Sequence, residues 1–462
     1  MKTNQMTLGI LAAAGMLALG ACSSEEATDV ATPQQTATDT HTGADARVPF
    51  KVYAPQAGTA LGTEQLTAMQ RLNGFGLRLF NSIREDGRSQ VFSPLSLDYA
   101  LGMVALGADG VPLNELNAML GFDTGDRTTL HDLCATLMQY LPAQDPDVSL
   151  NVANALYLNE ALSNVQLNPD YRQALNASYQ ADCEALDFGL KESVDYVNNW
   201  CSRQTNGFIT QVLDKMNKDA LAYLLNALYF KADWTCPFPT DYTHEADFHR
   251  EDGQVTKVQM MCQAISMNFP YEEDETAQVL SLPYARGRYF MTVLLPKEGQ
   301  TVDDVLASLT EERLAELVEL PAQESYDPYV IVRLPRFEAE VMTPLKESLE
   351  TAGIPSWFDE SGRLRGIAQY LDGMPIDVYV SKIFQKARIR VNEKGTEAAA
   401  VTVDEIGATG MRQTVDFTAN HPFVYFISER SSRAILFVGT YHGDDVQGVA
   451  GQGTGIRDIR MD

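Results

Sequence analysis

The sequence predicts an α+β fold, with a mainly helical first half followed by large, mostly antiparallel sheets. Two observations support this prediction. Early in the chain, apolar residues recur at the spacing of helix turns, whereas later apolar runs are short and are separated by polar turns. Helices and strands that segregate along a chain in this way are typical of α+β proteins. The 462 residues, 45% of them hydrophobic, suffice for a large core.

The helices are predicted from apolar periodicity. The first begins near Glu64, because apolar residues recur at helical spacing after it: Leu66, Met69, Leu72, Phe75, Leu77 and Leu79. Pro94 suits the first turn of a second helix, whose apolar residues continue to Gly107. Further helices are predicted over residues 194–213 and near residues 344–352.

The strands are predicted from short apolar runs. Residues 224–234 are almost continuously apolar, as expected for a strand in the middle of a covered sheet. In residues 387–391, Ile389 and Val391 alternate with arginines. The other predicted strands are residues 149–158, 255–261, 278–282, 289–295, 329–337, 423–428 and 434–440.

The first 21 residues have the features of an export signal. Lys2 provides a positive start, and the apolar run of residues 8–19 is too short to cross a membrane as an ordinary helix. The run ends in Leu-Gly-Ala-Cys, which resembles a bacterial lipobox and implies that Cys22 is lipidated. The alternative is an ordinary secretory peptide cut near Ala21.

The residues after Cys22 predict a tether and a location. Residues 22–62 are rich in Thr, Ala, Asp, Gln and Pro and are expected to form a flexible tether. One folded domain should span residues 63–443, followed by a tail over residues 444–462. The Ser-Ser-Glu-Glu run after Cys22 resembles the acidic export tag of some Bacteroidetes lipoproteins. We therefore expect a bacterial lipoprotein at the outer membrane or cell surface, with the periplasmic face as the open alternative.

The net charge limits the classes of partner, and the cysteine content limits disulfides and metal sites. A formal net charge of −27 disfavours nucleic acid and anionic membrane surfaces. Besides Cys22 there are five cysteines, an odd number whose spacing fits neither a disulfide framework nor a zinc site. We expect them to be mostly buried small apolar side chains: Cys134, Cys183, Cys201, Cys236 and Cys262.

The sequence lacks the motifs of the common enzyme classes. His244 and His249 are five residues apart, not the four that a zinc-protease helix requires, and a solvated loop is the better interpretation. Residues 451–455 lack the third glycine of a dinucleotide-binding loop. There is no Gly-x-Ser-x-Gly and no Gly-Lys-Ser/Thr motif. We therefore expect no enzyme activity, no cofactor and no metal.

Residues 391–412 are the stretch around which we expect the function to be organised. Gly395 offers a joint with permissive backbone angles, and residues 396–403 are small, hydroxyl-bearing or β-branched except Glu397. No proline in this stretch removes a backbone donor from a sheet. Composition alone allows either an exposed linker or a loop built to become a strand later.

Motifs along the chain resemble those of the serpin family. The resemblance covers about residues 64–443 and includes nine motifs in one order. They are Phe92-Ser93-Pro94-Leu95-Ser96, Asn198-Asn199-Trp200 with Thr205 and Gly207, residues 226–234, Leu282-Pro283-Tyr284, Leu294-Leu295-Pro296, Leu334-Pro335-Arg336-Phe337, residues 392–400, His421-Pro422-Phe423 and residues 435–439.

The resemblance implies a serpin fold with an exposed reactive-centre loop and a suicide-substrate mechanism. A serine endopeptidase attacks the loop and becomes an acyl-enzyme; the cut loop then inserts into the central sheet and distorts the trapped enzyme. Cysteine endopeptidases are a second target class that the resemblance leaves open. The alternative function is a non-inhibitory serpin that acts as a binding protein or chaperone. A lipid-anchored hydrolase is disfavoured by the missing motifs, and we expect a monomer.

The resemblance also assigns roles to individual residues. The hinge through which the loop enters the sheet matches Glu393, Gly395, Thr396, Glu397, Ala398, Ala399, Ala400 and Val401. The polar shutter beneath the strands that must part matches Ser93, Ser96 and Asn226, and the breach tryptophan above it matches Trp234. Taken alone, Ser93 is equally well a helix cap and Trp234 a core residue.

Two positions depart from the family pattern. Gln385 stands where the family usually has a histidine of the shutter; its amide can still donate and accept hydrogen bonds. Tyr441-His442-Gly443 stands where a proline usually follows the last strand.

The bond that the protease cuts is placed by counting from the hinge. Glu393 to Thr409 spans 17 residues, the usual span in the family, which places the reactive bond at Thr409–Gly410. The small residues before this bond suit an elastase-like or subtilisin-like protease. The alternative is cleavage slightly further along, at Met411 and Arg412, where a trypsin-like enzyme could cut after Arg412. It would lengthen the inserted segment and favour turnover as a substrate.

Overall fold

The computed structural model describes residues 61–263, 266–322, 328–359, 364–396 and 414–444. Over these residues the predicted α+β architecture is confirmed: two six-stranded sheets, one four-stranded sheet and one two-stranded sheet pack with nine α-helices. None of the described helices is both long enough and apolar enough to cross a membrane.

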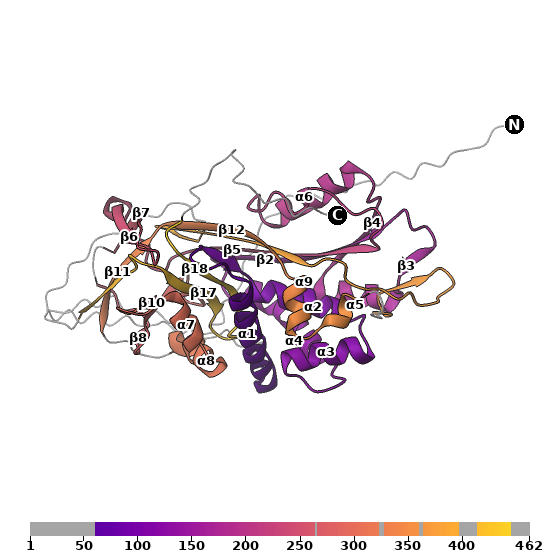
Figure 1. Cartoon of the computed structure of the whole chain (residues 1–462), viewed down its shortest axis with the longest axis horizontal. Coiled ribbons are helices and arrows are strands. Elements are labelled where there is room, and N and C mark those ends of the chain that lie inside the picture. Colours follow the sequence, from indigo (N-terminus) through magenta and orange to yellow (C-terminus); the bar gives the residue numbers. More distant parts are fainter. Residues whose placement is uncertain (1–60, 264–265, 323–327, 360–363, 397–413, 445–462) are drawn as a thin grey trace, which may run out of the picture. The chain divides into compact units, whose positions relative to one another are not determined.

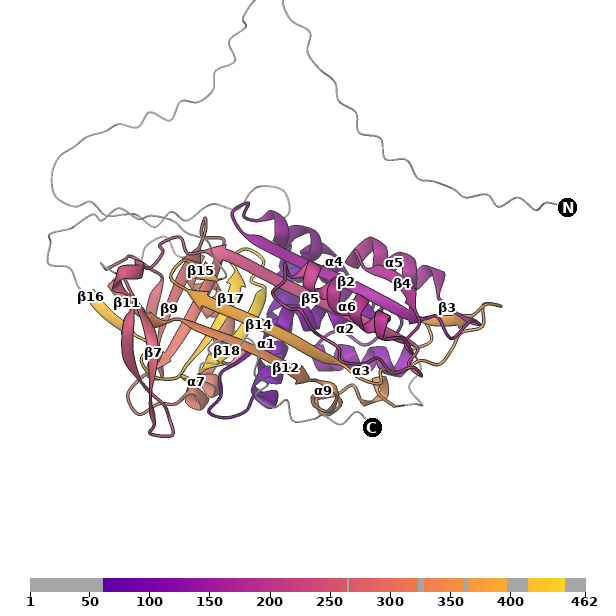
Figure 2. The ribbon, with the colours of Figure 1, turned by 90° about the horizontal axis from the view of Figure 1, so that it is seen from above.

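The central sheet has the strand order β12-β14-β15-β5-β2-β4. The bounds are β12 Phe337–Pro344, β14 Phe384–Asn392, β15 Gly395–Thr396, β5 Ala222–Asp233, β2 Ser149–Asn159 and β4 Asp182–Leu186. Neighbouring strands are antiparallel except β2 and β4, which are parallel. Figure 2 looks down on this sheet and shows β14, β5 and β2 running across the domain.

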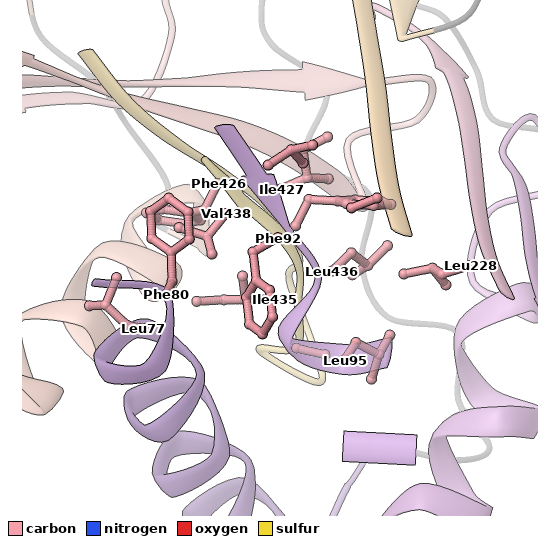
Figure 3. Close-up of a cluster of buried hydrophobic side chains, with 14 of the residues drawn as sticks. Leu77, Phe80, Phe92, Leu95, Leu228, Phe426, Ile427, Ile435, Leu436 and Val438 are labelled. Carbon is pink, nitrogen blue, oxygen red and sulfur yellow. The ribbon is translucent and has the colours of Figure 1, made fainter. Parts of the chain in front are cut away.

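A second six-stranded sheet has the order β1-β18-β17-β10-β9-β8 and is antiparallel throughout. The bounds are β1 Gln90–Phe92, β18 Ile435–Tyr441, β17 Phe423–Glu429, β10 Tyr289–Pro296, β9 Ala277–Tyr284 and β8 Tyr271–Glu273. Every residue of β10, β17 and β18 is buried, which explains their nearly continuous apolar sequences. Figure 3 shows how side chains of this sheet meet the first helix: Phe426, Ile435 and Val438 lie with Leu77 and Phe80.

Two smaller sheets complete the strands. The four-stranded sheet has the order β16-β11-β7-β6, in which only β11 and β16 are parallel. The bounds are β16 Thr414–Thr418, β11 Tyr329–Pro335, β7 Val255–Cys262 and β6 His244–His249. A two-stranded sheet pairs β13 Ala368–Tyr370 with β3 Val165–Leu167.

Helices cover both faces of the central sheet (Figure 1). α6 lies alone on one face, over its own small core, whereas α2, α4, α5 and α9 lie on the other face. The bounds are α1 Thr63–Ile83, α2 Pro94–Ala105, α3 Gly110–Leu120, α4 Thr129–Tyr140, α5 Pro169–Tyr179, α6 Lys191–Gln204, α7 Val302–Ser308, α8 Glu311–Glu319 and α9 Lys346–Ala352. The described residues also include four short 3₁₀ turns: Leu141–Ala143, Thr240–Tyr242, Leu320–Ala322 and Pro355–Trp357.

Three sequence predictions need correction. The helix predicted over residues 194–213 ends at Gln204, because Asn206 and Gly207 have left-handed φ angles of 51° and 77°. Residues 329–337 form the end of one strand and the start of another, β11 and β12, in different sheets. The segment from His244 to His249 is strand β6, not a loop.

The histidines of β6 do not form a metal site. On a strand, residues five apart point to opposite faces, so His244 and His249 diverge. Among the described residues, no cluster of three or more His, Cys, Asp or Glu could hold a metal ion. The five described cysteines are free; three are buried and two, Cys183 and Cys236, are half-buried, as expected for small apolar side chains.

Candidate functional site

β5 and β14 are separated by the width of one strand. No ladder joins them directly in the part of the chain that the structure describes; each pairs instead with β15, the two-residue strand Gly395–Thr396. A cavity of about 190 Å³ lies between the two strands, beginning five residues back from these ladder positions, at Ala227 and Lys386. It is bounded by residues 222–227 of β5 and 384–386 of β14, with Ser96 and Leu97 of α2 at its floor. We call this space the slot.

The register of β15 allows positions across the slot to be matched. Thr396 lies between Val391 of β14 and Ala232 of β5. Because β15 is antiparallel to both strands, β14 and β5 run parallel, and equal steps back along them reach the same level. Six steps back from the entrance, Gln385 of β14 faces Asn226 of β5 across the slot.

The two residues of β15 are fixed tightly at the entrance of the slot. A Cβ on Gly395 would lie 2.0 Å from the carbonyl oxygen of Ala232, so only glycine allows this approach of two backbones. Thr396 is 3% exposed, and its hydroxyl hydrogen-bonds that of Tyr284 at 2.7 Å. Burial raises the pKa of Tyr284, so this phenol stays neutral.

Trp234 holds the backbone that leads to β15. Its indole Nε1 donates to the carbonyl of Asn392 at 2.9 Å, and its backbone N–H donates to the carbonyl of Lys394 at 2.6 Å. Its ring stacks on Tyr284 with centroids 4.3 Å apart. Trp234 is therefore buried core, and its hydrogen bonds also fasten the turn before Gly395.

Glu393 anchors the same turn by charge. Its carboxylate accepts a hydrogen bond from Thr243 at 2.8 Å and forms an ion pair with Arg336. Its carbonyl accepts the N–H of Phe238 at 2.7 Å. Burial acts to raise the pKa of Glu393, but the hydrogen bonds from Arg336 and Thr243 outweigh it and hold the pKa below its usual value. The hinge thus starts from a charged, anchored residue.

Gln385 makes a two-fold contact with Ser93 beneath the slot. Its Oε1 accepts the N–H of Ser93 at 2.7 Å, and its Nε2 donates to the carbonyl of Ser93 at 2.8 Å. The Ser93 hydroxyl caps α2 by accepting the N–H of Ser96 at 3.1 Å and donates to the carbonyl of Leu436 at 2.7 Å. Ser93 therefore caps α2 and also binds Gln385 of β14, while its role in a shutter stays a prediction.

A second polar chain crosses under β5. The Ser96 hydroxyl hydrogen-bonds Oδ1 of Asn226, whose Nδ2 donates to Oδ1 of Asn154 at 2.7 Å. Nδ2 of Asn154 donates to the carbonyl of Tyr179 at 2.8 Å. The two strands that border the slot, β5 and β14, thus lie over hydrogen-bonded polar groups. Such groups exchange partners more readily than interlocked apolar side chains rearrange.

A family model described as serpin (serine protease inhibitor) matches residues 70–443. The chain belongs to the serpin family. Curated relatives bear inhibitor names: the leukocyte elastase inhibitor of Xenopus tropicalis is 31% identical over 375 residues, covering 79% of this chain and 97% of the relative. Serpin B4 of Homo sapiens is 32% identical over 390 residues, covering 79% and 97%.

Solved serpin structures share the fold. The thermophilic serpin tengpin in its native state matches with a TM-score of 0.72 and 28% identity, over 84% of this chain and 96% of that one. Its latent state matches with a TM-score of 0.68 and 26% identity, over 83% and 99%.

The structure brings the described serpin residues to one place. Ser93, Ser96, Asn226 and Gln385 lie beneath the slot, and Trp234 lies at its entrance beside Gly395. The remaining predicted positions lie outside the described residues: Cys22, Glu397, Ala398, Ala399, Ala400, Val401, Thr409, Gly410, Met411 and Arg412.

Sequence reasoning assigned no role to four residues of this site. Tyr284 and Arg336 lie within serpin motifs, which is the signal that could have pointed to them. Thr243 and Asn154 both lie outside the quoted family motifs. Only the fold places Thr243 against Glu393 and Asn154 against Asn226.

Proposed function

We propose that this serpin inhibits serine endopeptidases by inserting its cleaved reactive-centre loop into the slot. The observation that carries the proposal is the position of β15. Gly395 and Thr396 already form a strand between β14 and β5, and a cavity lies between the same two strands further along, at residues 222–227 and 384–386. A loop that continued β15 would become the missing central strand of this sheet.

The sequence of the loop suits this path. Continuing the register of Thr396 by six residues brings Thr402 between Asn226 and Gln385. The residues that enter before it are alanines, Glu397 and Val401, and every second one shares the inward face of Thr396. Small inward side chains can pass over the polar residues beneath the slot without displacing the apolar core.

Backbone pairing supplies the driving force. A full inserted strand would form roughly ten new hydrogen bonds at about 1 kcal/mol net each, on the order of 10 kcal/mol in all. Backbone groups of β5 and β14 that join no ladder on this side in the described part of the chain would be the donors and acceptors for these bonds. Insertion then competes with hydrolysis of the acyl-enzyme, and the loop must enter first for the protease to be trapped.

We place the reactive bond at Thr409–Gly410 and the target among elastase-like or subtilisin-like serine proteases. The small residues before the bond support this, and so does the likeness to an inhibitor named for leukocyte elastase. Cleavage after Arg412 by a trypsin-like enzyme is the second candidate, and cysteine endopeptidases are a further target class. The protein acts as a monomer in this proposal, without a cofactor.

The proposal is tested by incubating the protein with a panel of serine proteases. A denaturing gel should show a covalent complex, and mass spectrometry should show a released C-terminal peptide that begins at Gly410. Absence of a complex with every protease, while the loop is cut, would favour the non-inhibitory alternative. A peptide that begins after Arg412 would move the reactive bond.

We further propose that the mature protein is a bacterial lipoprotein anchored through Cys22. The support is the lipobox-like sequence that ends at this residue and the polar tether that follows. The mature N-terminus should be an acylated Cys22, and the protein should partition into detergent. An unmodified Cys22, or a mature N-terminus at another residue, contradicts the anchor without affecting the inhibitory proposal.

A further inference from the structure

The segment that follows α6 crosses the outer face of the slot. We call residues 206–213 the strap. Its Phe208 carbonyl accepts a hydrogen bond from Nη1 of Arg388 at 2.7 Å, and its Gln211 carbonyl accepts one from Nζ of Lys386 at 2.8 Å. The Phe208 ring meets Tyr229 of β5 edge to face, with centroids 6.2 Å apart. The strap thus contacts both strands that border the slot, β14 and β5.

The strap is held rigidly to α6. Oδ1 of Asn198 accepts the N–H groups of Val212 and Leu213, and its Nδ2 donates to the carbonyl of Leu213 at 2.7 Å. The buried hydroxyl of Thr205 accepts the N–H of Ile209 at 2.9 Å. Side chains of the strap pack into the small core beneath α6, so the strap cannot follow a moving strand freely.

Arg388 is itself fixed on its side of the slot. Its guanidinium lies 4.6 Å from the Phe208 ring centroid, and that of Arg390 lies 5.5 Å from it. Glu338 of the neighbouring strand β12 accepts hydrogen bonds from both arginines. Burial acts to raise the pKa of Glu338, but these hydrogen bonds outweigh it and hold the pKa below its usual value, so the carboxylate stays charged.

The register shows that Phe208 spans the slot. Three residues back from Val391 on β14 is Arg388, and three residues back from Ala232 on β5 is Tyr229, so these two lie opposite each other across the slot. Phe208 contacts both of them. Neighbouring strands lie about 4.8 Å apart, so closing the slot would shift Arg388 by about this distance relative to Tyr229. Phe208 could not keep both its contacts with Arg388 and its edge-to-face contact with Tyr229 through such a shift.

We propose that Phe208 and Arg388 form a latch that holds the slot one strand wide and so speeds entry of the cleaved loop. The inference rests on the proposed inhibitory function. The latch contacts are made while the slot is open, and they therefore favour the open arrangement over a closed one. They lie on the outer face, where the residue three steps into an inserted strand is position 399, an alanine small enough to pass beneath the Phe208 ring.

The test uses the full-length protein and four variants. Phe208→Leu keeps an apolar side chain but removes the aromatic face, and Arg388→Gln removes the guanidinium. Arg388→Lys keeps the charge without the planar fork. Gln211→Ala is the matched control, because the strap uses only the carbonyl of this residue toward β14. Circular dichroism and thermal melting confirm that each variant is folded.

The readouts are the rate of covalent trapping and the fraction of protein released as cut substrate. Phe208→Leu and Arg388→Gln should each slow trapping about 5- to 30-fold and raise the substrate fraction. The double variant should be no slower than the worse single variant, because the residues act as a pair. Arg388→Lys should recover part of the rate, and Gln211→Ala should match the wild type.

Unchanged or faster trapping in Phe208→Leu and Arg388→Gln overturns the latch. A second measurement separates this failure from failure of the proposed function. A synthetic peptide with the sequence of residues 396–409 is added to each uncut protein, and its rate of binding is followed by native gel. Slower peptide binding in the two variants supports the latch even where the wild type traps no protease, and equal rates overturn it.

Discussion

The two six-stranded sheets differ in how they are closed. In the sheet that contains β10, every neighbouring pair of described strands is joined by its own ladder, and β10 is buried along its whole length. Among the described strands of the central sheet, β5 and β14 share only the short β15, and residues 222–226 of β5 are half-buried. The interior strands of the β10 sheet have both neighbours in place, whereas β5 and β14 of the central sheet are joined to each other only through β15 in the described part of the chain.

This difference shows where the molecule can change. Removing an element of the closed sheet should cost stability, whereas changing an element of the slot should alter trapping more than stability. The largest effect should come from Thr396, at the entrance. Thr396→Arg asks a charged side chain to occupy a position that is 3% exposed, and its desolvation costs several kcal/mol. We expect the variant to be cut at the same bond and released with no covalent complex.

A gel for the complex, with mass spectrometry of the released peptide, checks this prediction. Thr67→Arg, at an exposed position of α1, is the control for an added charge and should trap normally. Trapping by Thr396→Arg at the wild-type rate would show that the entrance of the slot is not on the path of the loop.

The second prediction compares the loss of stability when one leucine of each sheet is replaced by alanine. Leu294 of β10 is 2% exposed, and Leu294→Ala should lower the free energy of unfolding by about 2–5 kcal/mol. Leu224 of β5 lines the slot and is half-buried, so Leu224→Ala should cost less than half as much. Denaturant titration of both variants measures the difference. Equal losses would mean that the slot is packed as tightly as the closed sheet.

A third prediction concerns Asp404 in the cleaved form. Eight steps from Thr396 the register reaches the level of Leu224 and Ile383, and an even number of steps places Asp404 on the inward face. An unpaired carboxylate in apolar surroundings costs several kcal/mol. Asp404→Ala should therefore raise the melting temperature of the cleaved protein or speed trapping. If neither changes, Asp404 finds a partner or remains hydrated after insertion.

The smallest effect should come from the anchor of the hinge. The folded pKa of Glu393 is lowered, so its ion pair with Arg336 contributes stability above the ordinary value of 4.5 and loses it as the pH falls through the folded pKa. Because Arg336 is about half exposed, the contribution should be only about 1 kcal/mol. Melting temperatures of wild type and Glu393→Gln should differ near pH 6 and converge toward pH 3.

Glu312→Gln, at an exposed position of α8, is the matched control for this titration and should show no such convergence. A difference between wild type and Glu393→Gln that persists unchanged down to pH 3 would mean that the carboxylate of Glu393 holds the hinge by shape rather than by charge.

The sequence by itself determined the elements whose signal is local. The apolar spacing after Glu64 predicted α1, and the continuous apolar runs predicted β10 and β17, because side chains that face one core repeat with the period of their own element. The family motifs also singled out Gly395 and Ser93, where the close backbone approach and the helix cap each depend on the residue type at one position; the hinge and shutter roles themselves stay predictions.

Only the tertiary structure decided how distant segments meet. Gln385 and Ser93 are 292 residues apart, and nothing local to either shows that one amide side chain satisfies both backbone groups of the other residue. The end of α6 at Gln204 was mispredicted because the apolar residues beyond it face the sheet from a strap, not from a helix. Hydrogen bonds and packing between remote strands, which periodicity cannot report, created the slot and placed Phe208 across it.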